Sequence, residues 1–132
     1  MGAIVIVPGL VLAALAAALH VFIFYLESLA WTTARARAVF GTSEEEAAAT
    51  RELAFNQGFY NLFLAAVTGI GIVAWAAGSG VVGASLMLAG IGSMAAAALV
   101  LFLSSPDKRP AAVKQGTLPL LAVVVLVLAL TL

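Results

Sequence analysis

Long apolar stretches, separated by short polar segments, set the hydrophobic pattern of this chain. A helix needs about 20 predominantly apolar residues to cross roughly 30 Å of hydrocarbon. Four stretches suited to such helices cover residues 3–31, 52–77, 81–103 and 115–132. We therefore predict an all-α polytopic membrane protein with one domain, built as a bundle of four transmembrane helices.

Two overlapping capping boxes follow the first span. Thr42 with Glu45 and Ser43 with Glu46 have the spacing at which a hydroxyl and a carboxylate satisfy free N–H groups at the start of a helix. A helix should therefore begin near residue 43. We expect it to continue unbroken to residue 77, with its first turns extending from the membrane into water.

The third span is rich in small side chains. Ser85, Ala89, Ser93 and Ala97 recur at a spacing of four, which places them on one helix face. Small residues let helix backbones approach closely in lipid, where no hydrophobic drive brings helices together. We predict that this face packs against other helices, within the chain or between copies in a homo-oligomer.

Polar side chains gather at the start of the second span, where they are costly and need a partner or a function. They form two neighbouring stripes on the expected helix. One stripe consists of Glu52, Asn56 and Tyr60, and the other of Gln57, Asn61 and Thr68. This cluster is the first candidate for a functional site.

The first span carries a second set of polar and aromatic side chains. His20, Phe24, Glu27 and Trp31 follow one another at steps of four, three and four, so they share one helix face. At about 1.5 Å of rise per residue, His20 lies roughly 10 Å deeper in the membrane than Glu27. The carboxylate therefore lies near the end of the span.

Composition and charge support the membrane assignment and exclude other classes. The chain is 64% hydrophobic and 9% charged, whereas charged residues make up about a quarter of a soluble domain. Zero formal net charge, without a polybasic cluster, speaks against nucleic-acid binding. The absence of cysteine excludes disulfides, thiolate metal sites and thiol nucleophiles.

The basic residues predict the orientation in the membrane. All six Lys and Arg lie in the first loop, just after it, or in the third loop. The positive-inside rule places these loops in the cytoplasm, so both termini should be extracytoplasmic in a multi-pass protein of the inner (plasma) membrane. This arrangement brings Glu27 and the polar start of the second span to similar depth, where the two polar faces can meet.

Several motifs resemble a family of small bacterial four-span membrane proteins, domain of unknown function 1304. The resemblance covers nearly the whole chain, and its most specific part is Asn56-Gln57-Gly58-x-Tyr60-Asn61. Other matching elements are His20, Tyr25-Leu26-Glu27, Trp31-Thr32-Thr33, Val39-Phe40-Gly41 and Gln115-Gly116-x-x-Pro119. The resemblance implies a four-span fold and a membrane location, and it implies no activity.

Glu27 and His20 are the candidate catalytic residues. A carboxylate withdrawn from water suits a general acid, a general base or a proton-coupled binding site. Alternatively, Glu27 could reach the cytoplasmic interface and pair with Arg35 or Arg51. His20 could relay protons or bind a substrate, or it could be bonded to a helix carbonyl or to Tyr60.

The remaining site candidates are expected to hold a small apolar or amphipathic ligand. They are Trp31, Arg51, Asn56, Gln57, Tyr60 and Asn61. Amide groups of this kind could instead serve only as interhelical hydrogen bonds, each contributing roughly 0.6 kcal/mol. One histidine and one nearby carboxylate are too few strong ligands for zinc, so we predict neither a metal nor a cofactor.

Three functional classes fit these features. The first is an enzyme or binding protein in which Glu27 gives or takes a proton on a bound molecule. The second is an oligomeric proton-coupled transporter of small molecules. The third is a structural or partner-binding membrane subunit, in which the polar stripe holds helices together.

Overall fold

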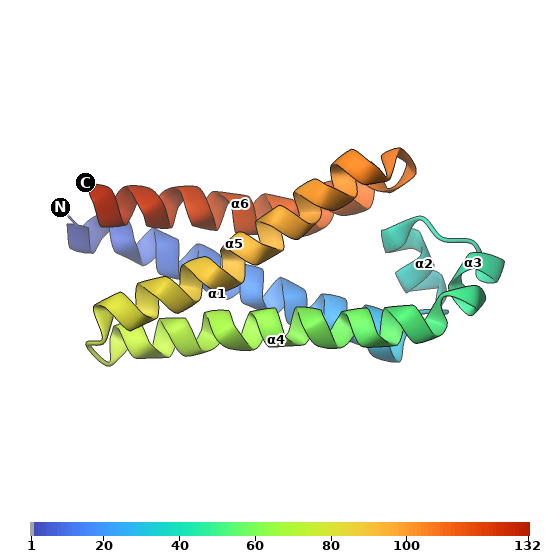
Figure 1. Cartoon of the computed structure of the whole chain (residues 1–132), viewed down its shortest axis with the longest axis horizontal. Helices are drawn as coiled ribbons and strands as arrows, with labels where there is room; N and C mark the ends of the chain where they lie inside the picture. The colour runs from blue at the N-terminus through green and yellow to red at the C-terminus, as the bar shows by residue number, and fades with distance from the viewer. Residues whose placement is uncertain (1) are drawn as a thin grey trace.

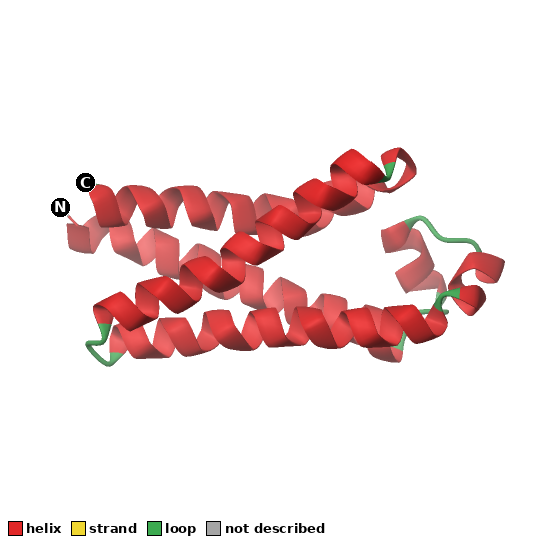
Figure 2. Cartoon of the chain, in the orientation of Figure 1, coloured by secondary structure: helices red, strands yellow, loops and turns green. Residues whose placement is uncertain are grey.

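Four long helices form one elongated bundle in the computed structural model, which describes residues 2–132 (Figure 1). About 90% of the chain is helical, and the described residues contain no strand (Figure 2). The predicted all-α bundle of four membrane-spanning helices is therefore confirmed. The long elements are α1 (Gly2–Phe24), extended by the π-helical turn η1 (Tyr25–Leu29), α4 (Arg51–Ala76), α5 (Gly80–Ser104) and α6 (Arg109–Thr131).

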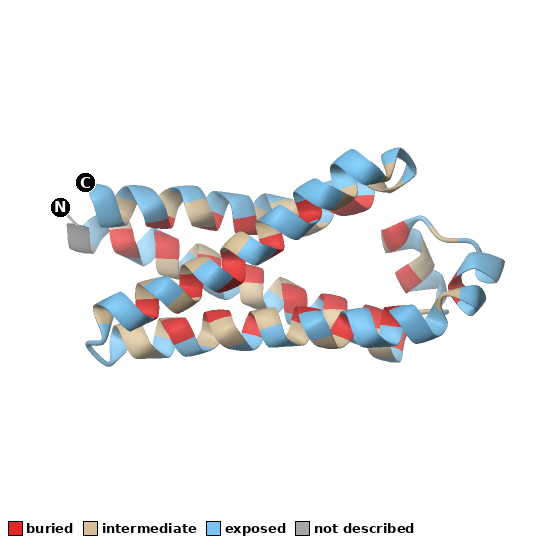
Figure 3. Cartoon of the chain, in the orientation of Figure 1, coloured by how far each residue is buried: buried red, intermediate tan, exposed pale blue. Residues whose placement is uncertain are grey.

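The four helices pack in a ring. The neighbouring pairs are α1 with α4, α4 with α5, α5 with α6, and α6 with α1, while α1 and α5 lie across the diagonal. Buried residues face the centre of this ring (Figure 3). Its main cluster includes Ala13, Ala16, Met87, Ile91 and Leu126. Small residues on α1 thus leave room for larger side chains from α5 and α6.

Helices α4 and α5 form a hairpin in which their backbones come into close contact. A Cβ atom on Gly71 would lie 2.6 Å from the backbone N of Met87, and one on Gly83 would lie 2.6 Å from the backbone N of Trp75. Glycine at both positions therefore permits backbone contact between the helices. The turn between them contains Gly78 with φ of +92°, a conformation that favours glycine.

The small-residue face predicted to pack inside the bundle faces outward instead. Ser85, Ala89, Ser93 and Ala97 are all exposed, so the part of the prediction that placed them against helices of the same chain is wrong. α5 carries small residues on more than one face. The face that contains Gly83 turns inward, because only glycine permits a backbone contact as close as the one at this position.

The first loop folds into two short helices, α2 (Ala34–Phe40) and α3 (Glu44–Ala49). Of the two possible capping hydroxyls, that of Ser43 caps α3, because Ser43 Oγ accepts a hydrogen bond from the backbone N of Glu46 at 3.1 Å, while the Glu46 carboxylate pairs with Lys108. Gly41, with φ of +67°, ends α2 in the left-handed conformation.

The helix expected to run unbroken from residue 43 is interrupted at Thr50. This residue has φ of −106° and ψ of 8° and separates α3 from α4. Its hydroxyl donates to Glu46 O at 2.7 Å and accepts from Trp31 Nε1 at 3.1 Å. The tertiary contact with Trp31 accompanies a local turn that the capping pattern alone does not predict.

The last helix begins at Arg109, earlier than the apolar stretch that starts at residue 115. A 3-10 turn, η2 (Pro106–Lys108), precedes it, and Pro110 lies in its first turn, where the missing N–H is tolerated. The chain termini lie together at one end of the bundle (Figure 1). The first and third loops lie at the other end, where α4 and α5 diverge.

Candidate functional site

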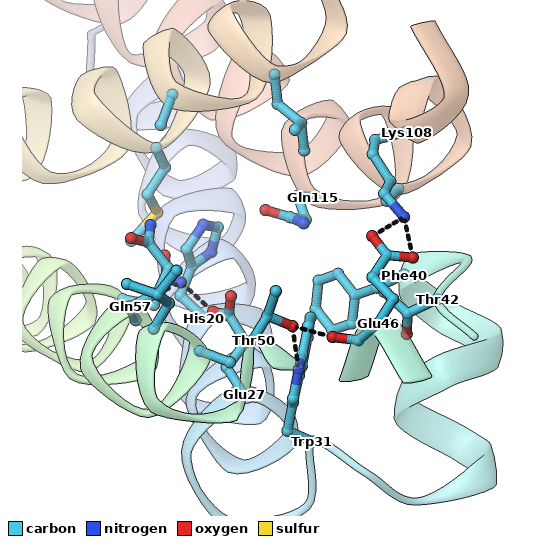
Figure 4. A pocket seen from close by; sticks show the side chains of 17 residues that line it. His20, Glu27, Trp31, Phe40, Thr42, Glu46, Thr50, Gln57, Lys108 and Gln115 are labelled. Atoms are coloured by element: carbon cyan, nitrogen blue, oxygen red, sulfur yellow. Dashed lines mark hydrogen bonds and ion pairs between the residues drawn. The ribbon is translucent and has the colours of Figure 1, made fainter. Parts of the chain in front are cut away.

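A cavity of about 380 Å³ lies near the loop end of the bundle. Side chains from α1, η1, α4, α5 and α6 and from the first and third loops line it (Figure 4). Five of the eight predicted site residues lie in its wall: His20, Glu27, Trp31, Gln57 and Asn61. The volume is within the range of small-molecule binding sites.

Glu27 and Asn61 form a buried polar pair in the cavity wall. Glu27 is 8% exposed and Asn61 is 9% exposed. Asn61 Nδ2 donates to Glu27 Oε1 at 2.5 Å and also faces Gln57 O at 3.3 Å. The two polar faces therefore meet, as their similar depth predicted. Among residues 2–132 Glu27 belongs to no ion pair, so the alternative in which it pairs with an arginine at the interface is wrong.

The backbone around Glu27 has an unusual local form. Glu27 lies in η1, a π-helical turn that continues α1. Such turns occur mostly as single-turn insertions in α-helices and are frequent at functional sites. Ser28, the next residue, donates from Oγ to Phe55 O at 2.7 Å and fixes η1 against α4.

Gly58 explains how α4 can come so close to η1. A Cβ atom at this position would overlap Ser28 Oγ and would lie 3.0 Å from the backbone N of Ser28. The motif that contains Gly58 thus has a clear local basis. Gly58 admits the π-helical turn, and Asn61 then meets the carboxylate that the turn carries.

His20 lies deeper in the same wall and is 2% exposed. Its Nδ1 lies 2.9 Å from Ala16 O. A carbonyl oxygen only accepts, so Nδ1 carries the hydrogen and Nε2 of the neutral ring is an acceptor. Of the two structural partners considered for His20, a helix carbonyl and Tyr60, the structure shows the carbonyl.

The loop end of the cavity is held together by polar contacts between the first and third loops. Lys108 Nζ lies 3.1 Å from Glu46 Oε1 and donates to Gly41 O at 3.0 Å. On the opposite side, Trp31 donates to Thr50. Figure 4 shows the continuous series of contacts from Trp31 through Thr50 and Glu46 to Lys108. The loops therefore form a polar cap over this end.

The other predicted ligand-binding residues are not part of this cavity. Arg51, Asn56 and Tyr60 do not line it, and all three are exposed. Asn56 Nδ2 donates to Glu52 O of its own helix at 3.1 Å. The contact at Gly58 turns the stripe of Gln57 and Asn61 inward, so the neighbouring stripe faces away from the bundle.

Comparison with known proteins identifies the family. A family model described as "Protein of unknown function (DUF1304)" matches residues 14–127. The chain belongs to the DUF1304 family. The match extends from α1 into α6 and includes the cavity residues on all four long helices. No curated protein and no solved structure matches this DUF1304 chain.

Sequence reasoning missed cavity residues of this DUF1304 protein that the loops and the later helices supply. They are Phe40, Thr42, Glu46, Thr50, Lys108 and Gln115, together with several apolar residues of α4, α5 and α6. Gln115 reaches from α6 into the cavity (Figure 4). Gln115 and Phe40 each lie in a motif that carries the family resemblance, which was the available signal, whereas the other loop residues reach the cavity only through the fold of the loops.

Thr42 adds an unsatisfied group to the cavity wall. Its Oγ1 is buried and has no hydrogen-bond partner in the part of the chain that the structure describes. Ser43 serves as the helix cap in its place. An unpaired buried hydroxyl is costly, and a bound polar group could satisfy it. No group of three or more potential metal ligands occurs within residues 2–132.

Proposed function

We propose that this DUF1304 membrane protein binds a small amphipathic molecule in the cavity, and that Glu27 exchanges a proton with it. One observation carries the proposal. The carboxylate of Glu27 is buried in the wall of a cavity large enough for a small molecule, and its hydrogen-bond partner is a neutral amide. Burying a carboxylate without a cation beside it costs free energy, so such a group marks a candidate functional site.

The remaining geometry gives the neighbouring residues separate roles. Asn61 holds Oε1 of Glu27 through a hydrogen bond, which leaves Oε2 for a ligand. His20 would offer Nε2 as a second acceptor deeper in the wall, because Nδ1 is engaged by Ala16 O. Gln57 and Asn61 lie on the same stripe of α4 and would orient the bound molecule.

The wall is suited to an amphipathic molecule because it combines apolar and polar side chains. Met94, Ala97 and Leu101 supply an apolar side from α5, opposite the polar groups of η1 and α4. Apolar contact provides most of the binding energy in such sites, while a few polar groups fix orientation. A ligand with an apolar body and one polar end therefore matches this surface.

We also propose that the loop end of the bundle faces the cytoplasm. The basic residues lie at this end or in the helix turns next to it, and the termini lie at the other. The positive-inside rule favours this orientation in the plasma membrane. The cavity would then lie in the cytoplasmic half of the membrane.

Native mass spectrometry of the gently solubilised protein tests the binding function. We expect the wild type to carry a co-purifying small molecule. Glu27→Gln should weaken its retention, and Ala97→Phe should exclude it by filling the cavity. Ala89→Phe is the matched control, because Ala89 lies in the same helix and is also exposed but does not line the cavity.

Two results would overturn the proposal. One is a wild-type protein that carries only the lipids also found on the Ala97→Phe variant. The other is a retained molecule whose occupancy is the same in Glu27→Gln and Ala97→Phe as in the wild type. The polar pair would then be a structural contact between helices.

A further inference from the structure

Glu27 is the one carboxylate of the cavity wall that no cation neutralises within residues 2–132. The other acidic group of the wall, Glu46, pairs with Lys108 at 3.1 Å. Lys108 is also the one Lys or Arg that lines the cavity. With Glu27 ionised and His20 neutral, the wall therefore carries one uncompensated negative charge, and a single positive charge on the ligand would complement it.

The hydrogen-bonding pattern at the same place also favours a donor. Oε2 of Glu27 accepts, and Nε2 of neutral His20 accepts because Nδ1 faces a carbonyl. A protonated amine carries N–H donors and a positive charge in one small group. It would satisfy both acceptors without needing a donor from the protein.

An aromatic pair strengthens the case for a cation. The rings of Trp31 and Phe40 have centroids 5.1 Å apart, and both residues line the cavity. Aromatic faces attract cations through their ring quadrupole, and more strongly where the site is desolvated. Together with Glu27, these rings provide a setting that favours an ammonium group over a neutral alcohol.

The exposed residues at the edge of the cavity, which form its rim, indicate the route by which a ligand enters. Leu53 and Gln57 on α4 and Ala97 on α5 line the cavity and are themselves exposed, and Leu53 is 71% exposed. These positions lie in helices long and apolar enough to cross a membrane. At the loop end the ion pair of Glu46 and Lys108 closes the first loop against the third. The open lateral side between α4 and α5 thus lies along helices that are long and apolar enough to cross a membrane.

We propose that the ligand is a lipophilic amine, which enters from the bilayer between α4 and α5 and places its protonated nitrogen against Glu27 and His20. This inference rests on the proposed function and names the class of molecule for the same cavity. The cavity of about 380 Å³ is within the size range of sites that hold small molecules. Proton exchange is then the transfer of an N–H proton to Oε2 of Glu27 and back, which balances without another reactant.

A set of three ten-carbon probes tests the class of ligand. Radiolabelled decylamine is equilibrated with the protein in lipid nanodiscs, and empty nanodiscs supply the background from partitioning into lipid. Unlabelled decylamine, decanol and decanoate then compete. We expect saturable decylamine binding, displaced at least about tenfold better by decylamine than by decanol, since a hydrogen bond to a charged group contributes about 1.5–3 kcal/mol. Decanoate should not compete.

Variants connect this binding to the cavity. Glu27→Gln should weaken decylamine binding by about tenfold or more, whereas Glu52→Gln, an exposed carboxylate of α4 outside the cavity, should leave it unchanged. Ala97→Phe should block the lateral rim, and Ala89→Phe should not. These two substitutions keep the test independent of whether Glu27→Gln folds.

The outcomes separate the two proposals. Equal competition by decanol, or unchanged decylamine binding in both Glu27→Gln and Ala97→Phe, would overturn the amine class while a co-purified neutral ligand still supported the binding function. No saturable binding of decylamine would also overturn the amine class. If the native protein in addition carried no specific small molecule, the binding function itself would fail.

Discussion

Gly58 determines how closely the π-helical turn with Glu27 approaches α4, so Gly58→Ala tests the architecture of the site. The new Cβ would overlap Ser28 Oγ and lie 3.0 Å from both Cβ and the backbone N of Ser28. The hydroxyl can rotate away only by giving up its 2.7 Å hydrogen bond to Phe55 O. The backbone N can move only if η1 moves away from α4.

The expected cost follows from these contacts. Overpacking of this kind costs about 1–3 kcal/mol, and loss of an interhelical hydrogen bond in a membrane costs about 0.6 kcal/mol. Alanine in place of glycine stabilises a helix by about 1 kcal/mol. Gly58→Ala should therefore lower the free energy of unfolding by about 0.6–2.6 kcal/mol.

Gly69→Ala is the matched control, because it lies in the same helix and its Cβ would meet nothing within 4 Å. We expect this variant to be unchanged or stabilised by up to about 1 kcal/mol. Reversible unfolding in mixed micelles with increasing sodium dodecyl sulfate, followed by circular dichroism, measures both variants. If Gly58→Ala proved as stable as Gly69→Ala, the close contact between η1 and α4 would be refuted.

Three further predictions use the same unfolding assay or hydrogen exchange. Asn61→Ala should destabilise the protein by about 1–3 kcal/mol, because it leaves a buried carboxylate oxygen unpaired. Asn56→Ala on the outer stripe of α4 should change stability by less than about 0.5 kcal/mol. Equal effects would contradict the assignment of Asn61 to the inner stripe and Asn56 to the outer one. Gly83→Ala should strongly destabilise the protein, because the new Cβ would lie 2.6 Å from a backbone N of α4. Gly92→Ala should leave stability unchanged, because a Cβ there meets nothing within 4 Å. Two similar unfolding curves would count against the glycine contact in the hairpin. Lys108→Met should lower the free energy of unfolding by no more than about 1 kcal/mol, as is usual for a partly exposed ion pair, but it should speed amide exchange in α2 and α3. Unchanged exchange would show that the third loop does not hold the first.

The fold could be predicted from sequence because lipid imposes simple demands. A segment that crosses hydrocarbon must be long, apolar and helical, and these properties can be seen directly in the chain. The structure of the first loop was harder to predict. Ser43 does cap α3, but the interruption at Thr50 accompanies a contact with Trp31 nineteen residues earlier in the chain. Local patterns contain no information on such a contact.

The inward stripe of α4 shows how far the site could be predicted from sequence. In a soluble protein the apolar face of a helix indicates the core, but in a bundle surrounded by lipid both faces can be apolar. Two polar stripes were visible, and only one of them meets Glu27. The choice depends on the space that Gly58 leaves for Ser28. The loop residues Thr42 and Lys108 reach the cavity only because the two loops fold against each other.

The π-helical turn at Tyr25–Leu29 has a consequence for the evolution of the family. A π-helical segment closes its bonds from i to i+5, so it holds one residue more than the α-helix that it interrupts. Loss of the codon for Tyr25 or Leu26 would convert the turn to ordinary α-helix and barely alter the length or hydropathy of the span. The residues on either side would keep their register, but those within the turn, Glu27 among them, would be displaced. Two family members could thus look identical as membrane proteins while only one presented its carboxylate to Asn61. When relatives are aligned across this turn, the number of residues matters as much as their identity.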